Sequence, residues 1–232
     1  MARLPRIELP NIPQHIIQRG NNRQACFAAE KDYLAYLKWL KKYSIDAGVN
    51  IHAWVLMTNH VHLLCTPTKP KAISSLMQSL GRRYVQYFNY TYSRSGTLWE
   101  GRFKSCLVQS NLYLMQLYRY IELNPVRASM VEEPSQYPWS SYQTNALGKV
   151  SNLCTPHKLY LELGMTKNER QNAYKALFKY HVSKEQLEEI RISLAKGLAL
   201  GNAKFKAEIE SQTGRRVTQG KRGRAKGWSK CN

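Results

Sequence analysis

The chain has 232 residues, and its 35 lysines and arginines against 15 aspartates and glutamates give a formal net charge of +20. This excess favours a polyanionic partner, and we expect nucleic acid ahead of a membrane surface. No apolar run approaches the roughly 20 residues that cross a bilayer, and the start, MARLPRIELP, has prolines and charges where a signal peptide would be apolar. We therefore expect a cytoplasmic protein with no membrane partner.

The five cysteines are scattered along the chain, and no two of them form a C-x-x-C pair. This spacing argues against a disulfide framework and against a structural zinc site. We expect all of them to be reduced.

Hydrophobic periodicity predicts the elements of the first part of the chain. A helix from about Glu30 to Ala47 is followed by Gly48, the usual stop residue, and a later helix is closed by the pair Asn124-Pro125. In chain order we expect a strand over 13–20, a helix over 30–47, strands over 51–57 and 60–65, a helix over 72–90, a strand over 105–110 and a helix over 112–123.

The order of these elements is strand, helix, strand, strand, helix, strand, helix. It predicts an α+β fold of the ferredoxin-like kind, in which helices pack on a sheet rich in antiparallel pairs. We expect the two strands that are joined near Thr58 and Asn59 to be central in this sheet.

The remaining chain, after PWSSY at 138–142, shows only helical patterns. Ser183 and Gln186 form an S-x-x-Q capping box, and Asn202 can cap another helix. The two helices indicate either a helix-turn-helix or a small packing appendage. We expect a domain over 1–145, a helical extension over 146–214 and a mobile basic tail over 215–232 that reaches for phosphate.

Two histidines lie one residue apart in the stretch NHVHLL, residues 59–64. Alternate residues of a strand share a face, so His60 and His62 point the same way, while Cys65 points to the opposite side. The pair is compatible with two hydrogen-bonded histidines on a sheet face or with a metal site that takes a third ligand from elsewhere. A zinc site with sulfur is disfavoured.

Tyr120 and Asn124, in YRYIELNPVRA, are four residues apart and would project from one face of a helix. An amide oxygen is an acceptable ligand for a hard divalent cation, and a phenol beside it would lie next to a polarised phosphate. Structural roles remain open for both residues, because the chain has 15 tyrosines and Asn124 also precedes a proline.

Several motifs together resemble a known family. His60-Val61-His62 resembles the signature of HUH single-strand nucleases, and RGNNR, GTLWEGRFKS and YRYIELNPVRA resemble the REP-associated tyrosine transposases of bacteria. The similarity spans about residues 10–145. It implies that Tyr120 is the nucleophile, that His60 and His62 bind Mg²⁺ or Mn²⁺, and that Asn124 takes the place of the third ligand, for which some relatives use glutamine.

The resemblance also implies an activity. We expect a metal-dependent single-strand DNA endonuclease and strand transferase that acts on hairpin DNA through a 5′-phosphotyrosine, in a nucleoid-associated monomer or homodimer. Basic and amide side chains near the motifs, on the helices and in the tail are the expected DNA contacts: Arg19, Asn21, Asn22, Arg23, Arg82, Arg83, Arg102, Lys104, Arg119, Arg127, Arg215, Arg216, Lys221, Arg222 and Arg224.

Two alternatives compete with this interpretation. One is a non-catalytic nucleic-acid-binding protein with a vestigial HUH site. The other is a nuclease that uses water as nucleophile, against which the sequence offers no acidic residue beside the histidine pair, Asp46 and Glu100 being the nearest. Trp99 can stack on a base or belong to the core, and the core is the expected place.

Overall fold

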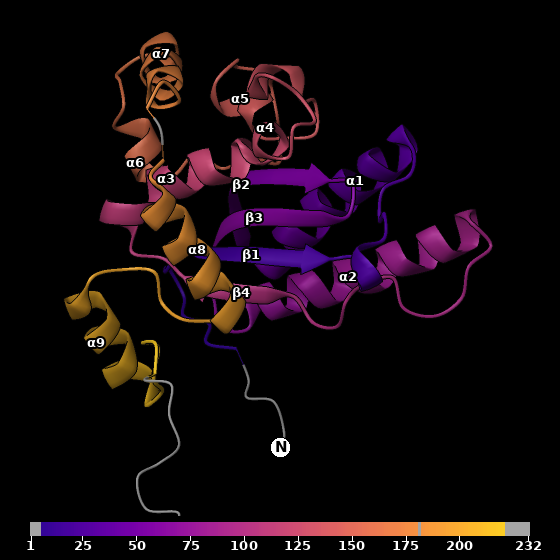
Figure 1. The fold of residues 1–232 in the computed structure, drawn as a ribbon, viewed down its shortest axis with the longest axis horizontal. Coiled ribbons are helices and arrows are strands. Elements are labelled where there is room, and N and C mark those ends of the chain that lie inside the picture. Colours follow the sequence, from indigo (N-terminus) through magenta and orange to yellow (C-terminus); the bar gives the residue numbers. More distant parts are fainter. Residues whose placement is uncertain (1–5, 181, 221–232) are drawn as a thin grey trace, which may run out of the picture.

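The computed structural model describes residues 6–180 and 182–220, and Figure 1 shows its central sheet with helices on both faces. The antiparallel strands are β1 (Gln14–Arg19), β2 (Val49–Met57), β3 (His60–Pro67) and β4 (Lys104–Leu107), in the order β2-β3-β1-β4. Helix α1 (Glu30–Ala47) follows β1, and α2 (Ala72–Thr91) follows β3. This connectivity is the ferredoxin-like one, so the predicted α+β fold is confirmed.

The expectation that β2 is a central strand is wrong. β3 and β1 are the central strands, and β2 lies at an edge, because β1 inserts between β3 and β4. Later parts of the chain cover the outer side of β2: Leu56 N donates to Trp139 O at 2.9 Å, and Thr155 N donates to Ile51 O at 2.7 Å. The backbone groups of this edge are therefore partly satisfied by segments far away in sequence.

Helices α1 and α2 cover one face of the sheet. Their apolar stripes place Tyr36, Leu40 and Tyr84 against the strand residues of that face, and all three side chains are fully buried. Trp99 is only 5% exposed, and its ring lies 5.9 Å from that of Tyr84. The core position expected for Trp99 is confirmed.

The other face is covered by α3 (Ser110–Glu122) and α8 (Lys184–Lys196). Strand β4 ends at Leu107 and not at residue 110, because Ser110 already begins α3. α3 ends at Glu122, and a short helix α4 (Asn124–Arg127) follows with Pro125 in its first turn, where the fixed φ of proline suits a helix start. Tyr120 and Asn124 thus lie on two successive helices and not on one.

Short and medium helices make up the later part of the chain. The capping box of Ser183 and Gln186 and the cap by Asn202, which accepts from Phe205 N, are confirmed. None of the helices in the described ranges is long and apolar enough to span a bilayer. The remaining helices are η1 (Asn21–Arg23), η2 (Pro134–Gln136), α5 (Tyr142–Asn145), α6 (Lys158–Leu161), α7 (Lys167–Leu177) and α9 (Ala203–Thr213).

A buried carboxyl group joins α3 to this later part. Glu122 is fully buried and accepts hydrogen bonds from Ser141 Oγ at 2.5 Å, Asn145 Nδ2 at 2.8 Å and Tyr174 Oη at 2.6 Å. Burial raises the pKa of Glu122 to about 7, while the three donors act in the opposite direction. The network fixes the helix that carries Tyr120.

Candidate functional site

Polar side chains collect on the sheet face that α3 and α8 cover. Ile17 pairs with His62 and Arg19 pairs with His60, and directly paired residues of neighbouring strands share a face. Lys104 pairs with Ile17 from the other side and joins the same face. Strand register therefore places two histidines, an arginine and a lysine together, with apolar residues on the opposite face.

A cavity of about 380 Å³ lies over these side chains. Side chains from the sheet, from the end of α3 and from α8 form its walls. Its lining comprises Ile17, Arg19, His60, His62, Glu100, Arg102, Lys104, Tyr120, Asn124, Arg191, Leu194 and Ala195. The histidine pair, Tyr120 and Asn124, which are far apart in sequence, thus meet in one cavity.

Each histidine of the pair is held through its Nδ1 atom. His60 Nδ1 donates to Asn59 Oδ1 at 2.6 Å, and the amide of Asn59 is oriented by its bond from Nδ2 to Arg23 O. His62 Nδ1 lies 2.8 Å from Nε2 of His15, a buried residue of β1. No hydrogen bond to a described residue occupies Nε2 of His60 or His62, and both residues line the cavity.

Both imidazoles are neutral near pH 7. Burial lowers the pKa of His60 to about 4, and the charge of Arg19 acts in the same direction. Burial also lowers the pKa of His62 well below its usual value, with His15, His60 and two arginines adding to the effect. A neutral imidazole keeps one nitrogen lone pair, which is the form that binds a metal ion.

Tyr120 reaches the cavity from the last turn of α3. Leu117 and Ile121 on the same helix are buried against the sheet, and Tyr120 itself is 6% exposed. Its ring centre lies 5.8 Å from that of His62 and 5.6 Å from that of His15, edge to face in both cases. In the described part of the chain, no hydrogen bond engages the phenol oxygen.

Arg127 lies over the Tyr120 ring. Its guanidinium carbon is 4.4 Å from the ring centre, and the side chain also donates to Tyr120 O. Burial lowers the pKa of Arg127 to about 10, and Arg191 acts in the same direction against an opposing effect of Tyr120. A guanidinium group with this pKa remains charged at pH 7, so positive charge lies beside the phenol.

Asn124 combines two roles that the sequence left open. Its Nδ2 donates to Tyr120 O at 3.0 Å and to Ile121 O at 3.2 Å, which satisfies carbonyls at the end of α3. Its Oδ1 makes no hydrogen bond to a described residue, and the side chain lines the cavity. The amide can therefore cap the helix and still offer an oxygen to a cation.

Some of the predicted DNA contacts lie in or next to the cavity. Arg19, Arg102 and Lys104 line it directly. The loop with Asn21, Asn22 and Arg23 lies beside its rim, because Gly20 N donates to Asn59 O at 2.8 Å and Asn59 Nδ2 donates to Arg23 O at 3.1 Å. Asn22 and Arg23 are exposed there.

Others are not brought to the cavity. Arg82 and Arg83 are exposed on α2, which covers the opposite face, and Arg83 lies 5.3 Å from the ring centre of Trp39. Arg119 donates to Tyr180 O, and Arg216 donates to Thr218 Oγ1 and Gln219 O. Arg215 lines a separate recess. Lys221, Arg222 and Arg224 lie outside the described residues, as does most of the predicted tail.

Three cavity-side residues escaped the sequence analysis. His15 lies on β1, which pairs with β3, and Glu100 N donates to Arg19 O at the end of β1. Arg191 comes from α8. Local patterns do not reveal these long-range placements. The argument that no acidic residue accompanies the histidine pair holds along the chain only, since Glu100 lines the same cavity. Alternation from Arg19 and Ile17 would have placed His15 on the same face as these two residues.

A family model matches the part of the chain that carries this cavity's histidines. The family model described as IS200-like transposase matches residues 9–124, half of the chain. The chain belongs to the IS200-like transposase family. The match ends at Asn124, so it includes the histidine pair, Tyr120 and Asn124. No curated protein matched the chain.

Two solved structures resemble the chain. A REP-associated tyrosine transposase bound to a REP hairpin is 19% identical, with a TM-score of 0.54, over 68% of this chain and 93% of that one. A chain described as a candidate transposase from Deinococcus radiodurans is 22% identical, with a TM-score of 0.37, over 52% of this chain and 96% of that one. The first match confirms the fold that the motif resemblance implied.

The donor set fits a hard divalent cation. Among the described residues no group of three or more His, Cys, Asp or Glu side chains is arranged to hold a metal ion, so two histidines alone do not complete a site. Oδ1 of Asn124, which lines the same cavity and makes no hydrogen bond to a described residue, would supply the oxygen ligand that Mg²⁺ or Mn²⁺ favours.

Proposed function

We propose that this IS200-like transposase is a metal-dependent single-strand DNA endonuclease and strand transferase with Tyr120 as its nucleophile. The observation that carries the proposal is the position of the Tyr120 ring, 5.8 Å from His62, in the cavity that His60 and Asn124 also line. A phenol beside two neutral imidazoles and a free amide oxygen suits covalent phosphoryl transfer. Buried tyrosines such as Tyr36 and Tyr84 belong to the apolar core and do not line this cavity.

In the proposed reaction, Tyr120 Oη attacks the phosphorus of the scissile phosphodiester. The new bond joins the phenol oxygen to the 5′-phosphate, and the bond from phosphorus to the 3′ oxygen breaks. The phenol loses its proton, and the leaving 3′ oxygen takes one up as a hydroxyl. The linkage retains a phosphodiester, so attack by a 3′-hydroxyl can reverse the step and join strands.

His60, His62 and Asn124 would hold the metal ion. When bound, Mg²⁺ or Mn²⁺ would polarise the scissile phosphate and offset the negative charge that develops on it. Two imidazole ligands favour Mn²⁺ somewhat over Mg²⁺. Arg127, over the Tyr120 ring, and Arg191, in the cavity wall, add positive charge from the chain itself.

The proposed substrate is a DNA hairpin with unpaired bases at its foot, as the solved relative bound to a REP hairpin suggests. We expect single-stranded DNA at the phenol, because a base pair would hinder the in-line approach of Tyr120 to the phosphorus. Arg19, Asn21, Asn22 and Arg23 are the proposed contacts to the unpaired bases, with Arg102 and Lys104 close to the cut.

The domain boundaries at residues 145 and 214 remain proposals, and so does a monomeric or homodimeric state.

The test is a covalent adduct. Wild-type protein, Mn²⁺ and a pool of folded oligonucleotides should give a species that survives denaturing electrophoresis, and Tyr120→Phe should remove it while DNA binding persists. His60→Ala should also lose the adduct. Binding without any adduct in the wild type would favour the non-catalytic alternative with a vestigial site.

One observation favours a second candidate, a nuclease with water as nucleophile. Glu100 lines the cavity and offers a carboxylate that can accept a proton from water. In that case Tyr120→Phe would still cut DNA, whereas Glu100→Gln would not. The proposed tyrosine chemistry predicts the opposite result: Tyr120→Phe should lose DNA cutting, and Glu100→Gln should keep it.

A further inference from the structure

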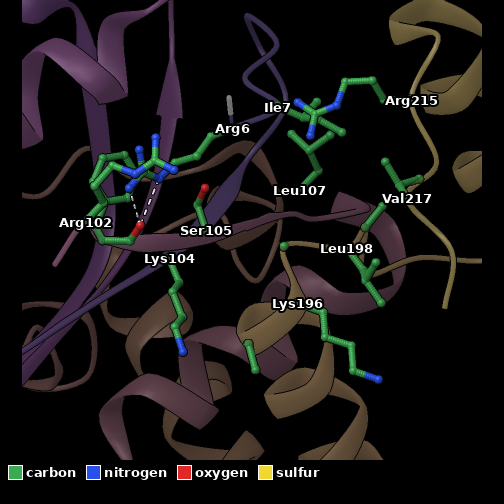
Figure 2. Close-up of a pocket in the computed structure, with 14 residues that line it drawn as sticks. Arg6, Ile7, Arg102, Lys104, Ser105, Leu107, Lys196, Leu198, Arg215 and Val217 are labelled. Carbon is green, nitrogen blue, oxygen red and sulfur yellow. Dashed lines mark hydrogen bonds between the residues drawn. The ribbon is translucent and has the colours of Figure 1, made fainter. Parts of the chain in front are cut away.

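A second recess, the edge groove, lies beside the cavity at the outer edge of β4. Figure 2 shows it, and its volume is about 270 Å³. Among the residues that the structure describes, no aspartate or glutamate lines it, and five cationic side chains do: Arg6, Arg102, Lys104, Lys196 and Arg215. The charge comes from the N-terminal segment, from the start of β4 and from the chain around α8 and α9.

The C-terminal part of the groove is built onto β4 by backbone hydrogen bonds. Leu200 N donates to Leu107 O at 2.8 Å, and Gln109 N donates to Leu200 O at 2.9 Å. Gly197 ends α8 with a φ of +66°, and a Cβ there would lie 3.6 Å from Ser105 O. Leu200 therefore forms an isolated parallel bridge with Val108, just after β4.

The N-terminal part is held at the opposite end of the groove. Arg6 Nε donates to Phe103 O at 2.8 Å, and the guanidinium carbon lies 3.6 Å from the centre of the Phe103 ring. Beneath the charges the floor is apolar, with Phe103, Leu107 and Val217 all buried. The groove thus combines a cationic rim with an apolar base.

Some polar groups of the groove have no partner among the residues that the structure describes. Within the described ranges, no ion pair engages Arg102, Lys104 or Lys196. Ser105 is only 8% exposed, and its Oγ makes no hydrogen bond to a described residue although it lines the groove, as Figure 2 shows. A nearly buried hydroxyl among unpaired cations indicates a site for a hydrogen-bonding anion.

The groove continues from the cavity. Arg102, Lys104 and Ala195 line both. Lys104 lies on the sheet face of the histidines, and Ser105, the next residue of β4, lies on the other face. A strand that passes the start of β4 would leave the cavity at Lys104 and enter the groove at Ser105.

We propose that the edge groove binds single-stranded DNA that continues from the candidate active site, with phosphates on the cationic rim and a base over the apolar floor. Cations beside apolar and aromatic surface are the usual combination for single strands, and a recess of this size does not admit a duplex. The inference rests on the proposed function and deepens it, because it gives the chain from α8 to Arg215 a part in substrate binding.

The test measures binding without chemistry, in full-length protein that carries Tyr120→Phe and without divalent metal. The probe is a fluorescent single strand of about 15 deoxythymidines, titrated at several salt concentrations. Lys196→Ala and Arg215→Ala should each lower the slope of log K against log salt by about 0.7 and weaken binding roughly fivefold near 0.1 M salt. Lys196→Arg, which keeps the charge, should retain the slope.

Lys38→Ala is the matched control, since Lys38 is exposed on α1, which covers the opposite sheet face. An equal loss in Lys38→Ala and Lys196→Ala would overturn the proposal, as would an equal loss for a duplex of the same length. Thermal unfolding of each variant separates a folding defect from a binding one. If the wild type forms no adduct but Lys196→Ala still loses slope, the groove is supported and the proposed chemistry is not.

Discussion

His15 Nε2 lies 2.8 Å from His62 Nδ1, and the two rings stack with centres 5.0 Å apart. His15 is fully buried, so this bond is inaccessible to water. If His62 binds a cation through Nε2, its proton must lie on Nδ1 and point at His15. The orientation of a metal-binding imidazole is commonly set by such a partner on its other nitrogen.

We predict that His15→Leu weakens Mn²⁺ binding roughly 10- to 100-fold, because the His62 ring loses its acceptor while the core keeps a similar volume. His15→Gln should retain most of the affinity, since its amide oxygen can stand near the place of Nε2. Calorimetric titration with Mn²⁺ measures both. Equal affinities for His15→Leu and wild type would remove His15 from any role in the site.

We predict that Arg127→Ala slows adduct formation by up to roughly 100-fold, because the charge 4.4 Å from the Tyr120 ring centre is lost next to the reacting phosphate. The rate of adduct formation in Arg127→Lys should lie between those of wild type and Arg127→Ala, because lysine keeps the charge without the planar guanidinium group. Rates come from gel time courses at saturating DNA. Arg170→Ala is the control, because Arg170 bonds to Gly164 O and Met165 O outside the cavity.

A pH effect on stability follows from Glu122. Its pKa is about 7 in the folded protein against 4.5 when unperturbed, so the folded state holds the proton more tightly. The contribution of Glu122 to stability is therefore complete below the unperturbed pKa of 4.5. It is lost as the pH rises through the folded-state pKa of about 7. Ionisation of the buried carboxyl is the physical cause of the loss.

We predict that the free energy of unfolding of Glu122→Gln, relative to wild type, rises by roughly 2–3 kcal/mol between about pH 5 and about pH 8. The glutamine side chain can accept from Ser141 and Asn145 and donate to Tyr174, so the network survives. Urea unfolding at both pH values gives the difference, in which titration of other groups cancels. A constant difference would contradict the raised pKa.

Asp32 supports the other side of the sheet. It is fully buried and accepts hydrogen bonds from Tyr87 Oη at 2.9 Å, Tyr92 Oη at 2.8 Å and Ala28 N at 2.8 Å. We predict that Asp32→Ala costs about 2–4 kcal/mol, since buried donors lose their acceptor. Asp46→Ala should cost at most about 1 kcal/mol, as its pair with Lys42 is exposed. Urea midpoints compare the two.

The sequence by itself determined the local features of this protein. Alternation placed His60 and His62 on one face and Cys65 on the other. The caps at Ser183 and Asn202 were predicted correctly, because a cap depends on residues within one turn. Four motifs in the expected order were enough to indicate the family, and the family implied the fold.

Only the tertiary structure decided which distant segments meet. β1 inserts beside β3 in the register that brings His15 to His62, and the loop before β4 brings Glu100 into the same cavity. α8 closes the cavity with Arg191, although its own sequence shows an ordinary amphipathic helix. Strand order, register and helix docking depend on the summed burial of many residues far apart in the chain, which no local pattern records.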